Sequence, residues 1–292
     1  MHRLLTLCAV TLIVCSTTVS IGADVPYEQT KNIVYAEVDG VGLVMDVFKP
    51  NGTANGVGIV DVASGAFYSD RGKIEDHRRA KMYDIFCGKG YCVFAVRPGS
   101  ITKFSLTEMD KNLKQGIRYV KEHAGEYKIN PDNLGITGAS AGGHLASLAA
   151  VTPDEKTSVK AAGVFFPPTD FLDYRGAKID ANTDPAKVDE RVKRFVFVTG
   201  AGPASASELV EKLTQISPAR RVTDKAPPFL IIHGDADPLV PLDQSERLVA
   251  ALKGASVPVE LIIKKGGGHP WPTIHEEVQV MADWFDKQLA GK

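Results

Sequence analysis

Length, composition and charge describe an ordinary globular protein. The 292 residues are 44% hydrophobic and 24% charged, with 27 Gly and 17 Pro, so the chain can bury a sizeable core and is neither disordered nor collagen-like. Lys and Arg number 34 against 35 Asp and Glu, a net charge of -1, which leaves no excess positive charge for phosphates and argues against nucleic acid as a partner.

The first 23 residues have the pattern of a secretory signal peptide. Arg3 precedes the apolar run 4–14, and small residues follow up to the expected cleavage site near residue 23. The run is shorter than the roughly 20 residues that span a bilayer, and no later segment approaches that length. A lipoprotein anchor is disfavoured because Val14, not a small residue, precedes Cys15. We therefore predict a secreted or periplasmic protein without a membrane span after signal removal.

Strands and helices are predicted to alternate after this segment. Two β-rich stretches flank the turn Asp39-Gly40 and indicate an antiparallel hairpin, and later apolar runs are typical of strands buried on both faces. The predicted strands are 31–38, 43–48, 57–62, 91–96, 133–137, 161–166, 229–233 and 257–263, and the predicted helices are 73–86, 106–123, 141–150, 242–252 and 273–289. The pattern predicts an α/β fold: a mostly parallel sheet with helices on both faces and ligands beyond the carboxyl ends of its strands.

Three smaller features complete this picture. Ser105 and Glu108 have capping-box spacing at the start of the helix 106–123. Segment 170–217, rich in charge, Pro, Ala and Ser, is too long for an ordinary connection, so we expect a small cap inserted into one domain spanning 24–292. Of the four cysteines, Cys87 and Cys92 lie beyond the signal; they could form a disulfide in an oxidising compartment, but Cys92 begins an apolar run, which favours a buried thiol.

The sharpest chemical motif is Gly138-Ala139-Ser140-Ala141-Gly142, between a predicted strand and a predicted helix. A nucleophile elbow needs small residues two positions before and after the serine, because the backbone segments approach closely at the strained turn. The alternative is a tightly packed glycine turn without chemistry. The position of the motif favours a nucleophilic Ser140.

A nucleophilic serine needs a general base. We favour His269, because the run Gly266-Gly267-Gly268 directly after a predicted strand lets the imidazole fold back over the site. His275 is the only serious rival, since the other histidines are better explained as packing or surface residues.

The base needs a carboxylate to fix its tautomer. Asp237 is our choice and Asp235 the second, because one of two Asp residues in such a loop usually hydrogen-bonds the turn itself; Asp170, after an earlier strand, is a third option. His233 and these acids could suggest a metal site, but no further cluster completes a ligand set, so we expect no metal.

These motifs together resemble the α/β-hydrolase fold serine hydrolases, particularly the esterase and lipase group that includes secreted bacterial acetyl-xylan and feruloyl esterase-like enzymes. The resemblance runs from about residue 57 to 287 with the order Ser140, Asp237, His269, and the family acid loop His-Gly-x-x-Asp-x-x-Val-Pro is matched by 233–241. It implies that Ser140 attacks an ester carbonyl, His269 carries the proton, Asp237 is the acid and no cofactor is needed.

One departure concerns the oxyanion hole. Relatives carry His-Gly-Gly-Gly-Trp, or a close version, where this chain has Ala63-Ser64-Gly65-Ala66-Phe67. Because the hole depends on backbone N–H groups, Gly65, Ala66 and Ala141 are the expected donors if the turn is kept. Alternatively, 64–67 is only a surface loop.

Aromatic residues flank the proposed site. Phe67, Tyr68 and Trp271 could stack on a sugar or an aryl acid, whereas Arg97 is better explained by an internal salt bridge than by substrate binding. We therefore expect a serine esterase acting on a small-molecule or oligosaccharide ester, with acetyl or feruloyl groups on plant polysaccharide as candidates. The alternatives are an exopeptidase related to the prolyl oligopeptidases and a catalytically inactive carbohydrate- or protein-binding module.

Overall fold

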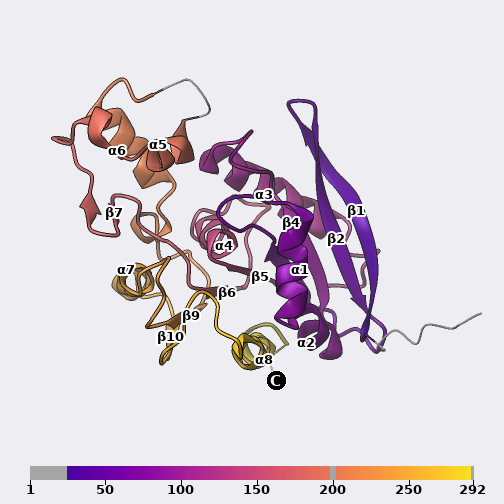
Figure 1. Cartoon of the computed structure of the whole chain (residues 1–292). Coiled ribbons are helices and arrows are strands. Elements are labelled where there is room, and N and C mark those ends of the chain that lie inside the picture. Colours follow the sequence, from indigo (N-terminus) through magenta and orange to yellow (C-terminus); the bar gives the residue numbers. More distant parts are fainter. Residues whose placement is uncertain (1–24, 198–201, 291–292) are drawn as a thin grey trace, which may run out of the picture.

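The computed structural model describes residues 25–197 and 202–290, so the predicted signal segment 1–23 lies outside it (Figure 1). Within this described part an eight-stranded sheet has the order β1-β2-β4-β3-β5-β6-β9-β10. Its strands are β1 (Tyr27–Val38), β2 (Val41–Pro50), β3 (Gly58–Val62), β4 (Cys92–Arg97), β5 (Leu134–Ala139), β6 (Ala161–Phe165), β9 (Phe229–Gly234) and β10 (Val259–Lys264).

The sheet has the predicted mixed character. β1 and β2 form the antiparallel hairpin, and β2 also pairs antiparallel with β4. From β4 to β10 every neighbouring pair is parallel. The carboxyl ends of β5, β9 and β10 therefore lie along one edge of the sheet, and the loops after these strands carry the predicted site residues.

Helices cover both faces of the sheet, and a hydrophobic core lies under each layer. Residues of α3 (Leu106–Glu122), α4 (Ala141–Val151) and α7 (Asp243–Gly254) pack into one core. Residues of α1 (Arg71–Arg79), α2 (Met82–Gly88) and α8 (Ile274–Phe285) pack into the other. This two-layered cover confirms the predicted α/β fold, a mostly parallel sheet with helices on both faces. No helix in the described ranges is long and apolar enough to cross a membrane.

Two helix predictions need correction. The single helix predicted over 73–86 is two helices, because Lys81 adopts a left-handed conformation with φ 57° and separates α1 from α2. The helix predicted over 273–289 continues beyond Phe285 as a short π-helix, Asp286–Ala290. The capping box that begins α3 is present as predicted, with Ser105 and Glu108 bonded reciprocally.

The segment 170–217, which we call the insertion segment, lies between β6 and β9. In its described residues it contains the small hairpin β7 (Asp173–Tyr174) and β8 (Ala177–Lys178), the helices α5 (Glu190–Val196) and α6 (Ala206–Gln215), and the 3₁₀ turn η1 (Pro185–Lys187); a second turn, η2 (Pro218–Arg220), follows directly. Figure 1 shows β7, α5 and α6 grouped together to one side of the sheet. Cys87 and Cys92 are free and buried, as expected for packed thiols.

Candidate active site

Ser140 lies at the sharp turn between β5 and α4. Its backbone has φ 54° and ψ -120°, a combination that L-residues rarely adopt. A Cβ atom on Gly142 would lie 2.2 Å from the Val62 carbonyl oxygen, and one on Gly138 would lie 2.5 Å from the Gly142 backbone. The two flanking glycines are therefore required by close backbone approach, which is the physical basis of the motif.

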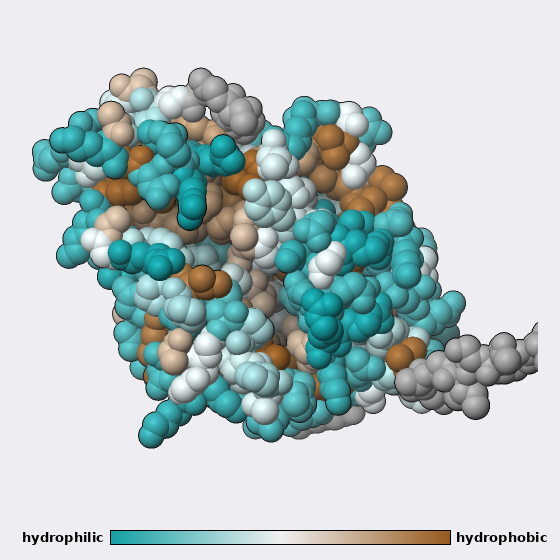
Figure 2. Space-filling model, viewed as in Figure 1, coloured by the Kyte–Doolittle hydropathy of each residue, from teal (hydrophilic) through white to brown (hydrophobic). Residues whose placement is uncertain are grey.

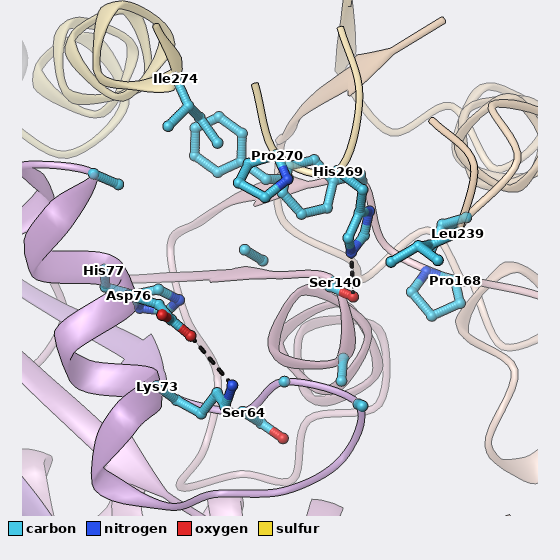
Figure 3. Close-up of a pocket in the computed structure, with 18 of the residues that line it drawn as sticks. Ser64, Lys73, Asp76, His77, Ser140, Pro168, Leu239, His269, Pro270 and Ile274 are labelled. Atoms are coloured by element: carbon cyan, nitrogen blue, oxygen red, sulfur yellow. Dashed lines mark hydrogen bonds and ion pairs between the residues drawn. The ribbon is translucent and has the colours of Figure 1, made fainter. Parts of the chain in front are cut away.

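The structure brings Ser140, His269 and Asp237 together in one hydrogen-bonded chain. The Ser140 Oγ lies 2.9 Å from His269 Nε2, and His269 Nδ1 lies 2.6 Å from Asp237 Oδ2. In Figure 3 the His269 side chain extends from the loop after β10, and its imidazole ring points at the Ser140 hydroxyl. This arrangement can transfer the hydroxyl proton to the imidazole and stabilise the resulting charge.

Asp237 is held ionised by its surroundings. Burial opposes the charge, but hydrogen bonds from His233, from His269 and from the N–H groups of Val240 and Leu239 outweigh it and hold the pKa of Asp237 well below its usual range. The two backbone bonds to Oδ1 are 2.9 and 2.8 Å long. An ionised carboxylate fixes the Nδ1–H tautomer of its histidine partner, which leaves Nε2 free to accept a proton.

The competing residues occupy other roles. The Asp235 Oδ1 accepts the Gly266 N–H at 2.6 Å and so secures the turn. The Asp170 Oδ1 accepts from Arg220 Nε at 2.7 Å. His275 lies in the first turn of α8 and does not line the pocket around Ser140.

His233 does not form a metal site. Its Nδ1 lies 2.7 Å from Ser245 Oγ, and its Nε2 donates to the Val240 carbonyl oxygen at 2.9 Å. Both ring nitrogens are thus already satisfied within the protein. Across residues 25–197 and 202–290, no group of three or more His, Cys, Asp or Glu side chains is arranged to hold a metal ion.

The loop after β3 departs from the predicted oxyanion hole at one position. The Gly65 N–H donates to the Tyr68 carbonyl oxygen at 2.9 Å, so it is not free to bind an oxyanion, and the prediction is corrected here. Ala66 and Phe67 both have left-handed backbone, with φ 48° and 64°. Among the described residues, the Ala66 and Ala141 N–H groups have no backbone acceptor, and both residues line the pocket beside Ser140.

Ser140 opens into a pocket of about 780 Å³. The three predicted aromatic residues, Phe67, Tyr68 and Trp271, all line it, although Trp271 is nearly buried and donates its Nε1–H to Glu277 at 2.7 Å. The insertion segment contributes an aromatic wall, and α1 with its N-cap contributes a polar one. The aromatic wall comprises Phe171, Tyr174 and Phe195, and the polar wall comprises Asp70, Lys73, Asp76, His77 and Arg79. Figure 2 shows brown apolar surface in the hollow below the α5–α6 region, within a mostly teal exterior.

One polar group at this pocket was not predicted from the sequence. His77 on α1 lies with its Nδ1 2.8 Å from Oδ2 of Asp61, a wholly buried residue of β3. The only signal was an acid inside the apolar run 57–62, since a buried charge requires a partner. The internal salt bridge predicted for Arg97 is wrong. In the described structure Arg97 donates to the Asn32 side-chain oxygen at 2.8 Å and forms no salt bridge.

Comparisons with known proteins assign the chain to a family. The family model described as BD-FAE matches residues 45–252, more than half of the chain. The chain is 34% identical over 155 residues to a "Probable carboxylic ester hydrolase LipM" of Mycobacterium tuberculosis, covering 50% of this chain and 33% of that protein. It is 26% identical over 192 residues to an "Acetylxylan esterase" of Xylanibacter ruminicola, covering 62% of this chain and 36% of that protein.

A solved structure aligns with nearly the whole chain. The "Truncated form of carbohydrate esterase from gut microbiota" superposes with a TM-score of 0.76 and 25% identity, covering 92% of this chain and 99% of that one. In contrast, the chain spans only about a third of the length of the curated relatives it matches.

Proposed function

The chain belongs to the BD-FAE family, with the α/β-hydrolase fold of esterases, and from this premise we propose that it hydrolyses carboxylic esters through an acyl-enzyme formed on Ser140. The observation that carries this proposal is the continuous hydrogen-bonded chain from Ser140 through His269 to Asp237 at the base of a pocket. Each of the three residues comes from a separate loop at one edge of the sheet, so three distant parts of the sequence converge on one hydrogen-bonded series.

In the proposed first step the Ser140 oxygen attacks the ester carbonyl carbon while His269 Nε2 takes the hydroxyl proton. The carbonyl oxygen becomes an oxyanion, which the Ala66 and Ala141 N–H groups stabilise. The tetrahedral intermediate collapses when the ester C–O bond breaks, and the alcohol leaves with the proton from His269. Water then attacks the acyl-enzyme, His269 takes its proton and returns it to Ser140, and the carboxylic acid is released.

Esters carried by carbohydrate are the substrate class that the relatives support. An acetylxylan esterase and a carbohydrate esterase are among them, and the pocket joins an aromatic wall to a polar one. We propose acetyl or feruloyl esters of plant polysaccharide or oligosaccharide as substrates. We also propose that the protein acts after export, which rests on the signal-like residues 1–23 alone.

Replacing Ser140 tests the reaction directly. Ser140→Ala in the full chain should lower kcat for a short-chain aryl ester by at least about 10⁴-fold, because the nucleophile is lost. Ser147→Ala is the matched control, since Ser147 lies in α4 and its buried hydroxyl donates to the Gly143 carbonyl oxygen at 2.7 Å.

A fluorophosphonate probe and a dipeptide amide separate the alternatives. We expect rapid labelling of the wild type and Ser147→Ala but not of Ser140→Ala, and much faster hydrolysis of esters than of the amide. An unlabelled, inactive wild type would favour the binding module, and faster cleavage of the amide would favour the exopeptidase.

A further inference from the structure

A buried carboxylate under the pocket holds a second histidine in place. Asp61 is wholly buried in β3, and its Oδ2 accepts from the Tyr83 hydroxyl at 2.9 Å and contacts His77 Nδ1 at 2.8 Å. A carboxyl group in an apolar interior requires hydrogen-bond partners, and Oδ2 has two of them, whereas Oδ1 has none among the described residues. Because Asp61 accepts at Nδ1, the His77 ring has a fixed tautomer and a fixed orientation.

The other nitrogen of His77 remains available on the pocket side. His77 lines the pocket, and its Nε2 has no hydrogen-bond partner among the described residues. This nitrogen is also not among the fully buried polar atoms that lack a partner, so it retains access to solvent. Figure 3 shows His77 on α1, across the pocket from Pro168 and Leu239, with Ser140 between the two sides. A substrate bound at Ser140 can therefore extend toward His77.

The neighbours of His77 form a balanced set of donors and acceptors. The Lys73 Nζ lies 3.2 Å from Asp76 Oδ2, and Arg79 also pairs with Asp76. Asp70 completes the wall and caps α1 through the Gly72 N–H at 2.7 Å. Two acids oppose two bases here, so the wall carries no strong excess of either charge. Such a surface suits neutral hydroxyl groups better than a carboxylate or an ammonium group.

The protonation chemistry of His77 points to the same ligand. Burial opposes the charged ring, but the adjacent Asp61 outweighs it, and the pKa of His77 is raised. The neutral ring accepts a hydrogen bond at Nε2, and the charged ring donates one. A hydroxyl can serve as partner in either state, because it both donates and accepts.

We propose that His77 is a specificity-determining residue whose Nε2 binds a hydroxyl of a sugar that forms the alcohol part of the ester. The proposal rests on the esterase function proposed above and assigns the polar wall of α1 to the sugar. The opposite wall of Phe171, Tyr174 and Phe195 is then left for apolar parts of the substrate. Binding energy at a remote hydroxyl would raise kcat/KM for sugar esters over simple alkyl esters.

Two substitutions at His77 separate ligand binding from support of the fold. His77→Asn keeps a side-chain N–H near the position of Nδ1, for Asp61, but removes the nitrogen that faces the pocket. His77→Gln places an amide near the position of Nε2. His123→Asn is the matched control, because His123 stacks on Tyr119 and lies outside the pocket.

The experiment compares esters that share an acyl group: ethyl acetate with an acetylated methyl xyloside, and ethyl ferulate with feruloyl arabinose. We expect His77→Asn to lower the ratio of kcat/KM for sugar ester over ethyl ester by about 5- to 30-fold, the range of one lost hydrogen bond. His77→Gln should retain more of this ratio, and His123→Asn all of it.

An unchanged ratio in His77→Asn would overturn the proposal. If both esters of a pair lose activity equally, the ratio is also unchanged, and the loss indicates a structural role for His77. If His77→Asn does not fold, the ratio in His77→Gln decides in the same way, because the proposal requires it to stay above one tenth of the wild-type value but below that value. A wild type that hydrolyses none of the four esters would instead contradict the proposed function.

Discussion

At the scale of single residues, the turn that carries Ser140 requires a residue without a Cβ atom at position 142. A Cβ on Gly142 would lie 2.2 Å from the Val62 carbonyl oxygen, which belongs to the neighbouring strand and cannot easily move. We therefore expect Gly142→Ala to cost about 2 kcal/mol or more of unfolding free energy, as overpacking does, and to reduce ester hydrolysis strongly. Urea denaturation and a kinetic assay would measure both effects.

Gly125→Ala provides the control for this prediction. A Cβ there would meet nothing within 4 Å, and its φ is not in the left-handed region, so it should be neutral or stabilising by up to about 1 kcal/mol. Equal stability and activity in the two variants would contradict the steric account of the elbow.

The lowered pKa of Asp237 makes part of the free energy of unfolding depend on pH. Its pKa is lowered in the folded protein by the hydrogen bonds that outweigh its burial. The folded state therefore binds a proton less readily than the unfolded chain, whose Asp has a pKa of about 3.9. The stabilisation is complete above that pH and is lost as the pH falls toward the lower folded pKa.

Asp237→Asn should remove this pH-dependent contribution. The difference in unfolding free energy between wild type and variant should be constant from about pH 5 to 7 and should shrink below about pH 4. Unfolding by urea at a series of pH values would measure it, with Asp224→Asn, whose exposed carboxylate is outside the site, as control. A difference that grows on acidification would refute the assignment.

At the scale of elements, α3 begins with the capping box that was predicted from the sequence. Ser105 Oγ accepts from the Glu108 N–H at 3.3 Å, and the Glu108 carboxylate accepts the Ser105 N–H at 2.7 Å. Ser105→Ala should lower the unfolding free energy by about 1 kcal/mol, with Thr53→Ala in an exposed loop as control. An unchanged urea midpoint for Ser105→Ala would show that the cap does not limit stability.

Prediction from sequence succeeded where residue types carry a recognisable signal and failed where a backbone conformation carries none. Periodicity and turn residues placed the strands of the sheet, and the Ser105 cap was visible as spacing. The break at Lys81 carries no Gly, Asn or Pro signal, so the left-handed residue was not foreseen. Likewise, the Gly65 N–H is taken by Tyr68 through a bridge within the loop, and no spacing rule indicates this pairing.

At the scale of the whole molecule, the sheet explains why a site was predictable at all. Parallel strands end at a common edge, so loops after β5, β9 and β10 meet although Ser140, Asp237 and His269 are far apart in sequence. The link between His77 and Asp61 was not predictable in this way. It joins a helix to the middle of a strand, and only packing brings the two together.

The insertion segment lies outside the eight-stranded sheet. We propose that it acts as a cap over the pocket. Phe195 of α5 has its ring centroid 5.0 Å from that of Phe67 and 4.8 Å from that of Phe171. Phe67 directly follows Ala66, so this aromatic contact connects the segment to the proposed oxyanion loop. A movement of the insertion segment would therefore shift both the aromatic wall of the pocket and the proposed oxyanion loop.

Phe195→Ala should loosen this connection. Phe195 lines the pocket, and an aromatic contact with a bound feruloyl ring is worth about 0.5 to 1.5 kcal/mol. We therefore expect KM for a feruloyl ester to rise by up to about tenfold while kcat for an acetyl ester changes little. Arg194→Ala is the control, because Arg194 is exposed on the same short helix. An unchanged KM for the feruloyl ester in Phe195→Ala would mean that the segment does not shape substrate binding, since the contact lies in the pocket wall that the ester must touch.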